Sequence, residues 1–236
     1  QDFIKQTVAE AISSKDFFYC FTNSQKRKNL FGLSDEDFLK AVAKGIRDRA
    51  IVYKNPGKDS FLEKSSTAVG PDTFKQAVTE AFYNSLSSAD SVETSMRLRV
   101  FLNELGIENE VLSSSRAQET YRSALIGYLS SERLNDACRL ADDKSGFAVS
   151  GEVLQDSEVL DKAHQVLIGL IKQNKLDDAD KLVQVFPLGT RTIEDLEAQG
   201  IIRDRISRLL NFSDYLGLNF EKLNNIKYDI CVNIES

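Results

Sequence analysis

The sequence predicts an all-α protein built from stacked antiparallel helical hairpins. Its 236 residues include only 3 prolines and 12 glycines, so long segments run without the residues that interrupt regular structure. Several of these segments carry apolar residues at steps of three and four, which is typical of amphipathic helices. One stretch also recurs with an offset of 42 residues, and such repetition indicates an array of helical repeats, or α-solenoid.

The first long helix is predicted in the segment DEDFLKAVAKGIRDRAIVYK, residues 35–54. Ser34 precedes an acidic first turn, which the positive end of the helix dipole favours. Apolar residues then follow at steps of four and three. The sequence Asn55-Pro56-Gly57 ends the helix, because proline cannot continue it and glycine favours a turn.

Later segments carry similar start signals. Pro71 suits the first position of a helix, where its missing N–H would have no intrahelical partner. Ser115 with Gln118 has the pattern of a capping box, and Asp156 precedes the apolar segment that follows it. Thr192 stands before a further helical segment. Together these signals predict about ten helices joined by short polar turns.

Two segments fit a strand as well as a helix. Residues 50–65 also fit a β-hairpin that turns at Asn55-Pro56-Gly57, because valine and tyrosine favour strands. Near the end, residues 226–234 alternate apolar and polar side chains, but their isoleucines also recur at steps of four. A short β element at either place is an open alternative.

The stretch ALIGYLSSERLNDACRL, residues 124–140, recurs as VLIGLIKQNKLDDADKL, residues 166–182. In each copy the first half is expected to end one helix, four polar residues to form a turn, and the second half to begin an antiparallel helix. The alanines are expected where two helices cross closely, and the glycines where a neighbouring helix approaches the backbone. The repeat positions predicted to shape the structure are Gly127, Leu134, Ala137, Leu140, Gly169, Leu176, Ala179 and Leu182.

Such hairpins stack because one hairpin cannot bury its apolar face alone. A degenerate upstream copy is expected in FYNSLSSADSVETSMRL, with Ser95 at the alanine position and Leu98 at the last leucine position. The predicted organisation is an N-terminal helical region over residues 1–70 with a loop at 55–71, then a repeat region over 71–236 with units at 74–115, 116–157 and 158–199.

The motif LIGxLxxxxLxDAxxL resembles the helical-hairpin repeats of tetratricopeptide and pentatricopeptide proteins. Its longer spacing is more similar to the α-solenoids of vesicle-coat and nuclear-pore scaffold proteins. The period exceeds that of the regular families, and the tryptophan and proline positions of the tetratricopeptide pattern are absent. This resemblance implies a scaffold or adaptor that binds another protein within a multi-subunit complex.

Few residues suggest catalysis. His164 is the only histidine, so pairs of histidine ligands are excluded, and its place among apolar residues of a helix is more typical of a surface or interface position. Cys20, Cys138 and Cys231 are widely separated, which is not the spacing of a zinc site or a disulfide framework. Cys138 aligns with Asp180 of the other copy and is interpreted as a partly exposed, inert thiol rather than a redox-sensitive one.

Acidic groups occur at residues 35–37, at Asp142-Asp143 and at residues 177–180. None has the glycine and glutamate positions of a calcium loop, and helix starts explain them because negative charge is favoured there. No phosphate loop, nucleophile elbow or HExxH motif occurs. We therefore expect no enzyme activity, no cofactor and no metal site.

The net charge is −6, so binding to nucleic acid would need a local basic surface. Such clusters occur, and they support an alternative function as an RNA-binding helical-repeat protein that uses arginine and lysine faces. The candidate interaction residues are Lys26, Arg27, Lys28, Arg203, Arg205 and Arg208, with Arg97 and Arg99 as a further pair.

The chain has no apolar run of about 18 residues and no basic segment followed by an apolar one at its start. These features, with the unpaired cysteine pattern, predict an intracellular protein, cytoplasmic or nuclear-associated, that does not insert into membranes. Residue 1 is glutamine rather than methionine, which suggests a fragment of a longer chain.

Overall fold

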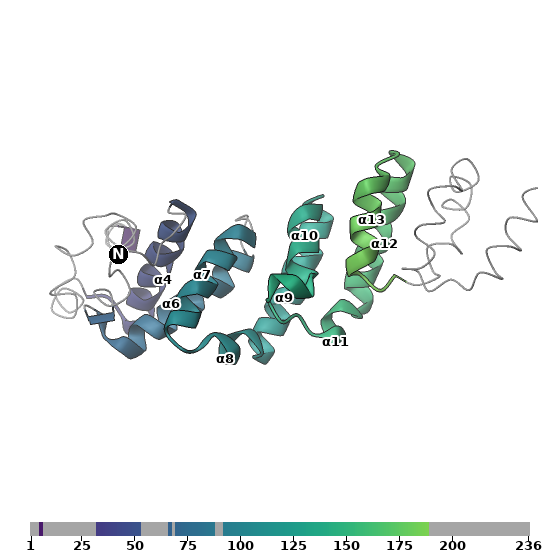
Figure 1. Cartoon of the computed structure of the whole chain (residues 1–236). Coiled ribbons are helices and arrows are strands. Elements are labelled where there is room, and N and C mark those ends of the chain that lie inside the picture. Colours follow the sequence, from purple (N-terminus) through teal and green to yellow (C-terminus); the bar gives the residue numbers. More distant parts are fainter. Residues whose placement is uncertain (1–4, 7–31, 53–65, 68, 88–91, 189–236) are drawn as a thin grey trace, which may run out of the picture. The chain divides into compact units, whose positions relative to one another are not determined.

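The computed structural model describes residues 5–6, 32–52, 66–67, 69–87 and 92–188 (Figure 1). Within these residues the elements with defined bounds are nine α-helices and one 3₁₀ turn, and no strand occurs. The predicted all-α class is therefore confirmed for this part of the chain. The chain divides into two compact units between Thr120 and Tyr121.

Three long helices form the first unit: α4 (Asp35–Val52), α6 (Pro71–Ser87) and α7 (Val92–Glu104). Each packs against the other two, and the short α8 (Glu108–Leu112) packs against α7. Apolar residues at helical spacing give each long helix one buried face. The fully buried side chains of this core include Ile46, Phe74, Phe82, Leu98 and Phe101.

The first two start signals are confirmed. The Ser34 Oγ accepts a hydrogen bond from the N–H of Asp37 at 3.1 Å, so this serine caps α4. α6 begins at Pro71, directly after Gly70, whose φ is 91°. Glycine suits this left-handed conformation because it has no Cβ to clash with the backbone.

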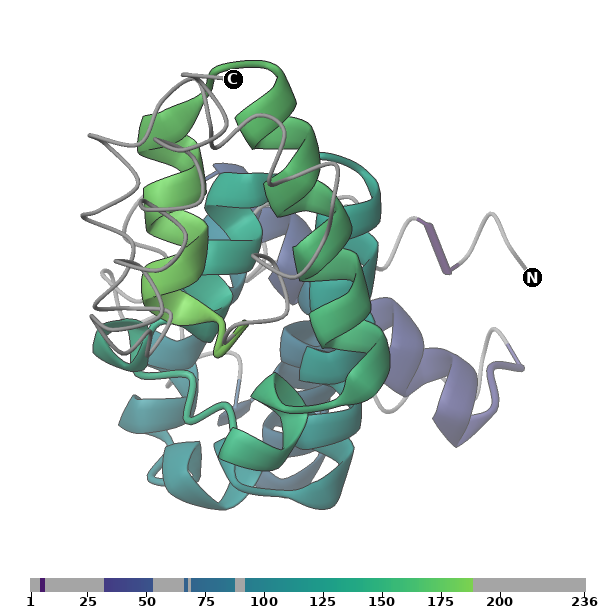
Figure 2. The ribbon, with the colours of Figure 1, turned by 90° about the vertical axis from the view of Figure 1, so that its right-hand side faces the viewer.

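The second unit contains most of α9 (Ser115–Ser130), followed by α10 (Leu134–Ala141), the 3₁₀ turn η1 (Asp143–Ser145), α11 (Gly151–Leu154), α12 (Ser157–Lys172) and α13 (Leu176–Val185). α13 packs against both α10 and α12, and the last two helices lie side by side (Figure 1, Figure 2). The fully buried side chains include Tyr121, Leu125, Leu140, Phe147, Leu182 and Phe186.

The helix bounds repeat with the offset of 42 residues that the sequence shows. α9 spans 115–130 and α12 spans 157–172, while α10 begins at Leu134 and α13 at Leu176. Both repeated stretches therefore have a helix–turn–helix structure. Each turn is three residues long.

The two turns also have the same backbone geometry. Glu132 and Asn174 are at equivalent positions and have φ values of 58° and 62°. The N–H of the next residue donates to the carbonyl five residues back, from Arg133 to Tyr128 at 2.8 Å and from Lys175 to Leu170 at 2.9 Å. This is the Schellman motif, which satisfies carbonyls at the end of a helix.

The cap of α9 differs from the prediction by one residue. Ser114, not Ser115, caps the helix, because its Oγ accepts from the N–H of Ala117 at 3.1 Å. Gln118 donates to an upstream carbonyl rather than completing a capping box. The equivalent cap of α12 is Asp156, whose Oδ1 accepts from the second and third N–H groups of the helix at 3.0 and 3.2 Å.

The predicted role of Gly127 and Gly169 is wrong. A Cβ built at either position would have no heavy atom within 4 Å apart from its own helix backbone. No helix of the described ranges approaches there, so packing against this part of the chain does not require the glycines.

Ala137 and Ala179 are fully buried, as are the leucines three residues after them. The helices that carry the alanines, α10 and α13, pack against each other. A larger side chain at either alanine would therefore have to displace packed atoms.

The upstream region has related features in its own unit. α7 begins at Val92, 42 residues before Leu134. Ser95 and Leu98 are fully buried, and the Ser95 Oγ lies 2.7 Å from the Ser85 Oγ of α6. The small residue at this position is thus held by a buried hydrogen bond between helices.

Several predictions fall on residues outside the described ranges. They are the hairpin alternative beyond Val52, the helix after Thr192, and the undecided segment at residues 226–234.

We expect Ala137→Leu and Ala179→Leu each to lower the free energy of unfolding by about 1–3 kcal/mol, because the added carbons overpack a closed contact. Asn135→Leu and Asp177→Leu are matched controls, since both positions are exposed and also 42 residues apart; they should change it by about 0.5 kcal/mol. Urea unfolding measures all four. Equal losses at buried and exposed sites would contradict the prediction.

Gly127→Ala and Gly169→Ala should each raise the free energy of unfolding by about 0.5–1 kcal/mol, because alanine restricts the unfolded chain and meets no neighbour in the fold. Gly146→Ala is the opposite control, since Gly146 has a φ of 73° that strains an alanine. Destabilisation at either helical glycine would mean that its backbone is approached after all.

Candidate functional site

The structure describes some of the predicted site residues and not others. The basic cluster at residues 26–28 and the arginines at 203, 205 and 208 lie outside the described ranges. Of the eight repeat positions, five are buried in the core: Ala137, Leu140, Leu176, Ala179 and Leu182. Leu134 and Gly169 are half-buried and line a groove, while Gly127 is exposed.

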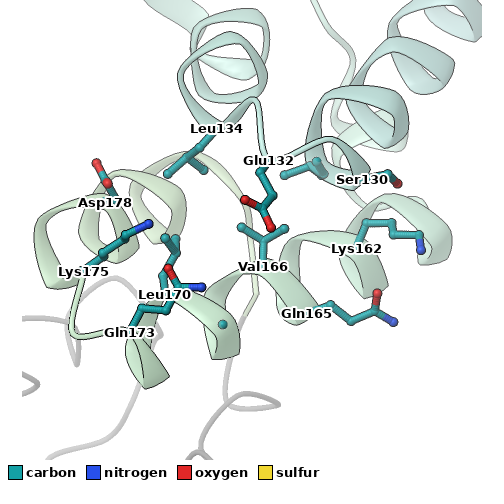
Figure 3. Close-up of a pocket in the computed structure, with 12 residues that line it drawn as sticks. Ser130, Glu132, Leu134, Lys162, Gln165, Val166, Leu170, Gln173, Lys175 and Asp178 are labelled. Carbon is teal, nitrogen blue, oxygen red and sulfur yellow. The ribbon is translucent and has the colours of Figure 1, made fainter.

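This groove lies in the second unit and has a volume of about 350 Å³ (Figure 3). That size is at the lower end of the range for ligand pockets. It is bounded by the end of α9, the turn after it, the start of α10, α12 and the start of α13. The lining residues are Leu129, Ser130, Glu132, Leu134, Lys162, Gln165, Val166, Gly169, Leu170, Gln173, Lys175 and Asp178.

Apolar side chains line the middle of the groove. Leu134, Val166 and Leu170 are half-buried, so part of each is accessible to an apolar group. Figure 3 shows Lys175 on one side of Val166 and Lys162 on the other, with the Glu132 side chain beside Val166. The groove therefore combines an apolar middle with charged sides.

Some charged groups of the groove have no partner among the described residues. Asp178 accepts from the Lys181 Nζ at 2.9 Å, so its charge has a partner. Glu132, Lys162 and Lys175 form no hydrogen bond or ion pair with the described residues through their side chains. Two ammonium groups and one carboxylate of the groove thus have no partner in the described part of the chain.

Three side chains at equivalent positions of the first copy contact one another. There the Arg133 guanidinium lies over the Tyr128 ring at 4.5 Å and pairs with Asp136 at 2.8 Å. Tyr128 is buried. The counterparts in the second copy are Leu170, Lys175 and Asp178, which make neither contact. The second copy therefore has a leucine and a flexible lysine at the positions where the first copy has a contact between tyrosine and arginine.

Glu132 has an unusual backbone conformation. The equivalent Schellman position is Asn174 in the second copy and Gly106, with φ 69°, at the end of α7. Glycine and asparagine are the residues that favour this region, whereas other side chains there are strained by about 1 kcal/mol or more. Glu132 thus combines a backbone conformation that favours glycine or asparagine with a place in the lining of the groove.

The described arginines of the basic clusters are used inside the fold. The Arg97 guanidinium donates to the last carbonyls of α4, on Ala50 and Ile51, at 2.9 and 3.1 Å. Arg99 pairs with Glu108 at 2.8 Å. These contacts stabilise the helix ends and leave the two guanidiniums less available to phosphate groups.

Two further ion pairs join helices at related positions. Within the first unit, Arg116 of α9 makes a bidentate pair with Glu80 of α6, with one contact at 2.8 Å. Within the second unit, Arg122 of α9 pairs with Glu158 of α12 at 2.7 Å. Both pairs join residues 36 apart, and an offset of 42 relates Glu80 to Arg122 and Arg116 to Glu158. The earlier position of each pair is acidic in the first pair and basic in the second, and the later position is the reverse.

Arg122 also contacts the cap of α12, with its Nε 3.0 Å from the Asp156 carboxylate. This hydrogen bond lowers the pKa of Asp156 below its usual value of 3.8, and the two backbone N–H groups that the carboxylate caps act in the same direction. Asp156 therefore stabilises both the start of α12 and its contact with α9.

Cys138 is half-buried, and its burial raises the pKa of the thiol to about 11. The thiol is protonated at neutral pH, and a protonated thiol is a poor nucleophile. His164 is half-buried on α12 at the position equivalent to Arg122. Neither residue lines the groove.

The acidic groups begin helices, as predicted for two of them. Residues 35–37 form the first turn of α4, and Asp177 and Asp178 that of α13. Asp142 caps η1. Among the described residues, no group of three or more histidine, cysteine or acidic side chains could hold a metal ion. None of the helices in the described part is long and apolar enough to cross a membrane.

We expect Asp156→Asn to lose less stability than the wild type when the pH falls from about 7 to about 3. A carboxyl with a lowered pKa contributes stability above its unfolded pKa, and this is lost as the pH falls through the folded value. Asparagine also caps helices well, so the change acts mainly on the ion pair. Urea unfolding at both pH values measures the difference.

The control for this variant is Asp143→Asn, which replaces an exposed acid without an ion pair to the described residues. It should keep the acid sensitivity of the wild type. Identical acid sensitivity in all three proteins would contradict the role of the pair between Asp156 and Arg122.

Comparison with known proteins gives no match among protein-family models, curated proteins or solved structures. The resemblance to helical-repeat families thus has no relative to support it. The function must be argued from the repeated helices and from the groove.

Proposed function

We propose that the chain is a non-catalytic helical-repeat scaffold or adaptor segment that binds another protein within a larger assembly. The single observation that supports this most is the correspondence of α9–α10 with α12–α13, in helix bounds, turn conformation and caps. Stacked helical hairpins expose extended surfaces, and proteins built from them use these surfaces for binding.

The exchanged ion pairs support the same proposal. If equivalent hairpins stack in one register, the first helix of each hairpin should contact the first helix of the next through the same two positions. The pairs of Glu80 with Arg116 and of Arg122 with Glu158 fit this expectation, each within its own unit. Stacked repeats require that neighbouring units contact one another through equivalent positions, as these two ion pairs do.

RNA binding through basic faces is the alternative. It depends on the clusters at residues 26–28 and 203–208, whereas the described Arg97, Arg99, Arg116 and Arg122 have partners within the chain. The net charge of −6 also opposes approach to a phosphate backbone. These observations favour a protein partner.

We expect the tagged chain to capture partner proteins from cell extract that remain bound after nuclease treatment, as identified by mass spectrometry. Binding to mixed-sequence single-stranded RNA, measured by fluorescence anisotropy at about 50 and about 200 mM salt, should be weak at both concentrations. Phosphate contacts would instead give an affinity that falls steeply over this range.

The two measurements separate the two functions. Partners lost on nuclease treatment, together with tight and salt-sensitive RNA binding, would replace the proposal with the RNA alternative. An untagged extract and a tagged unrelated helical protein serve as controls for non-specific capture.

A further inference from the structure

We propose that the groove beside α12 binds a short acidic, amphipathic segment of a partner protein, with apolar side chains in its middle and a carboxylate towards each end. This inference rests on the proposed protein-binding function and names the surface and the kind of partner. It begins from the difference between the two copies of the repeat.

In the first copy the side chains at three of these positions contact one another. Arg133 covers Tyr128 and pairs with Asp136, so neither the ring nor the guanidinium is available. In the second copy Asp178 pairs with Lys181 instead, and Lys175 and the half-buried Leu170 line the groove. A partner can supply the contacts that the first copy makes internally.

The charges determine the chemistry of that partner. Lys175 and Lys162 lie on opposite sides of Val166 (Figure 3) and have no ion-pair partner among the described residues. Carboxylates on either side of an apolar centre would pair with both ammonium groups. Such partly exposed pairs contribute modestly each, but they orient the segment along the groove.

The apolar contacts determine the middle of the segment. Val166, Leu170 and Leu134 are half-buried and would become buried beneath one or two aliphatic or aromatic side chains, which favours binding through removal of apolar surface from water. Gly169 lines the same surface without a Cβ, so the backbone of α12 is accessible there.

Glu132 adds selectivity. Its carboxylate lies beside Val166 (Figure 3), where it would repel an acidic residue in the middle of the segment. It therefore discriminates against uniformly acidic partners, as repulsive elements do in specific interfaces. This role accounts for a glutamate at a position where glycine or asparagine would be unstrained.

The experiment is selection of random 12-residue peptides displayed on phage against the full chain. Enriched peptides should carry apolar residues in the middle and aspartate or glutamate on either side. A synthetic, fluorescein-labelled copy of the most enriched peptide then gives the affinity by anisotropy. We expect the Lys162→Gln/Lys175→Gln double variant to bind about tenfold more weakly.

A second variant copies the contact between arginine and tyrosine from the first repeat into the second. Leu170→Tyr with Lys175→Arg keeps the charge of the groove but allows an arginine to cover a tyrosine and to pair with Asp178. It should also weaken binding about tenfold, with no loss of thermal stability. Lys144→Gln is the control, because Lys144 is an exposed lysine of the same unit that does not line the groove.

Three results would overturn the inference. They are an absence of enriched peptides, enrichment of basic peptides, and equal binding of the enriched peptide to the wild type and both groove variants. The last result would place binding elsewhere on the chain and leave the scaffold function standing. Failure of the scaffold function itself would appear separately, as loss of captured partners after nuclease treatment.

Discussion

The second unit depends on the burial of one apolar face on each of two short helices. α10 and α13 are too short to be stable alone, and their apolar positions include residues with no exposed surface, Ala137 with Leu140 and Ala179 with Leu182. The contact between these two helices brings the two copies of the repeat together. Caps, turns and ion pairs refine that arrangement, but each contributes less than the burial does.

Much of this architecture could be predicted from the sequence. The start signals at Ser34 and Pro71 and the turns after residues 130 and 172 are local features, which depend on a few adjacent residues. Buried alanines followed by leucines are likewise visible as a periodic pattern. Most helix boundaries could therefore be predicted from a few adjacent residues at each one.

The errors came from features that depend on neighbours in space. Glycine occurs at the same position in both copies, as Gly127 and Gly169, yet no helix described in the structure approaches either one. Identity between the copies shows that a residue recurs, but not which residues pack against it. Two consecutive serines left the cap of α9 ambiguous by one residue. The groove was not predicted because identical positions alone do not define it: Leu134 and Gly169 line it, but so do Leu170 and Glu132, which differ between the copies as Tyr128 against Leu170 and Glu132 against Asn174.

The exchanged charges at the helix junctions have a consequence for the order of the hairpins. Removing the middle hairpin would bring the position of Glu80 opposite that of Glu158, and two carboxylates would meet. Duplicating the middle hairpin would bring the position of Arg122 opposite a second Arg116, and two guanidiniums would meet. Like charges at such contacts are unfavourable. At these two contacts the charges therefore favour the present order of the helices over an order in which the middle hairpin is lost or duplicated, by the modest amount that partly exposed ion pairs contribute.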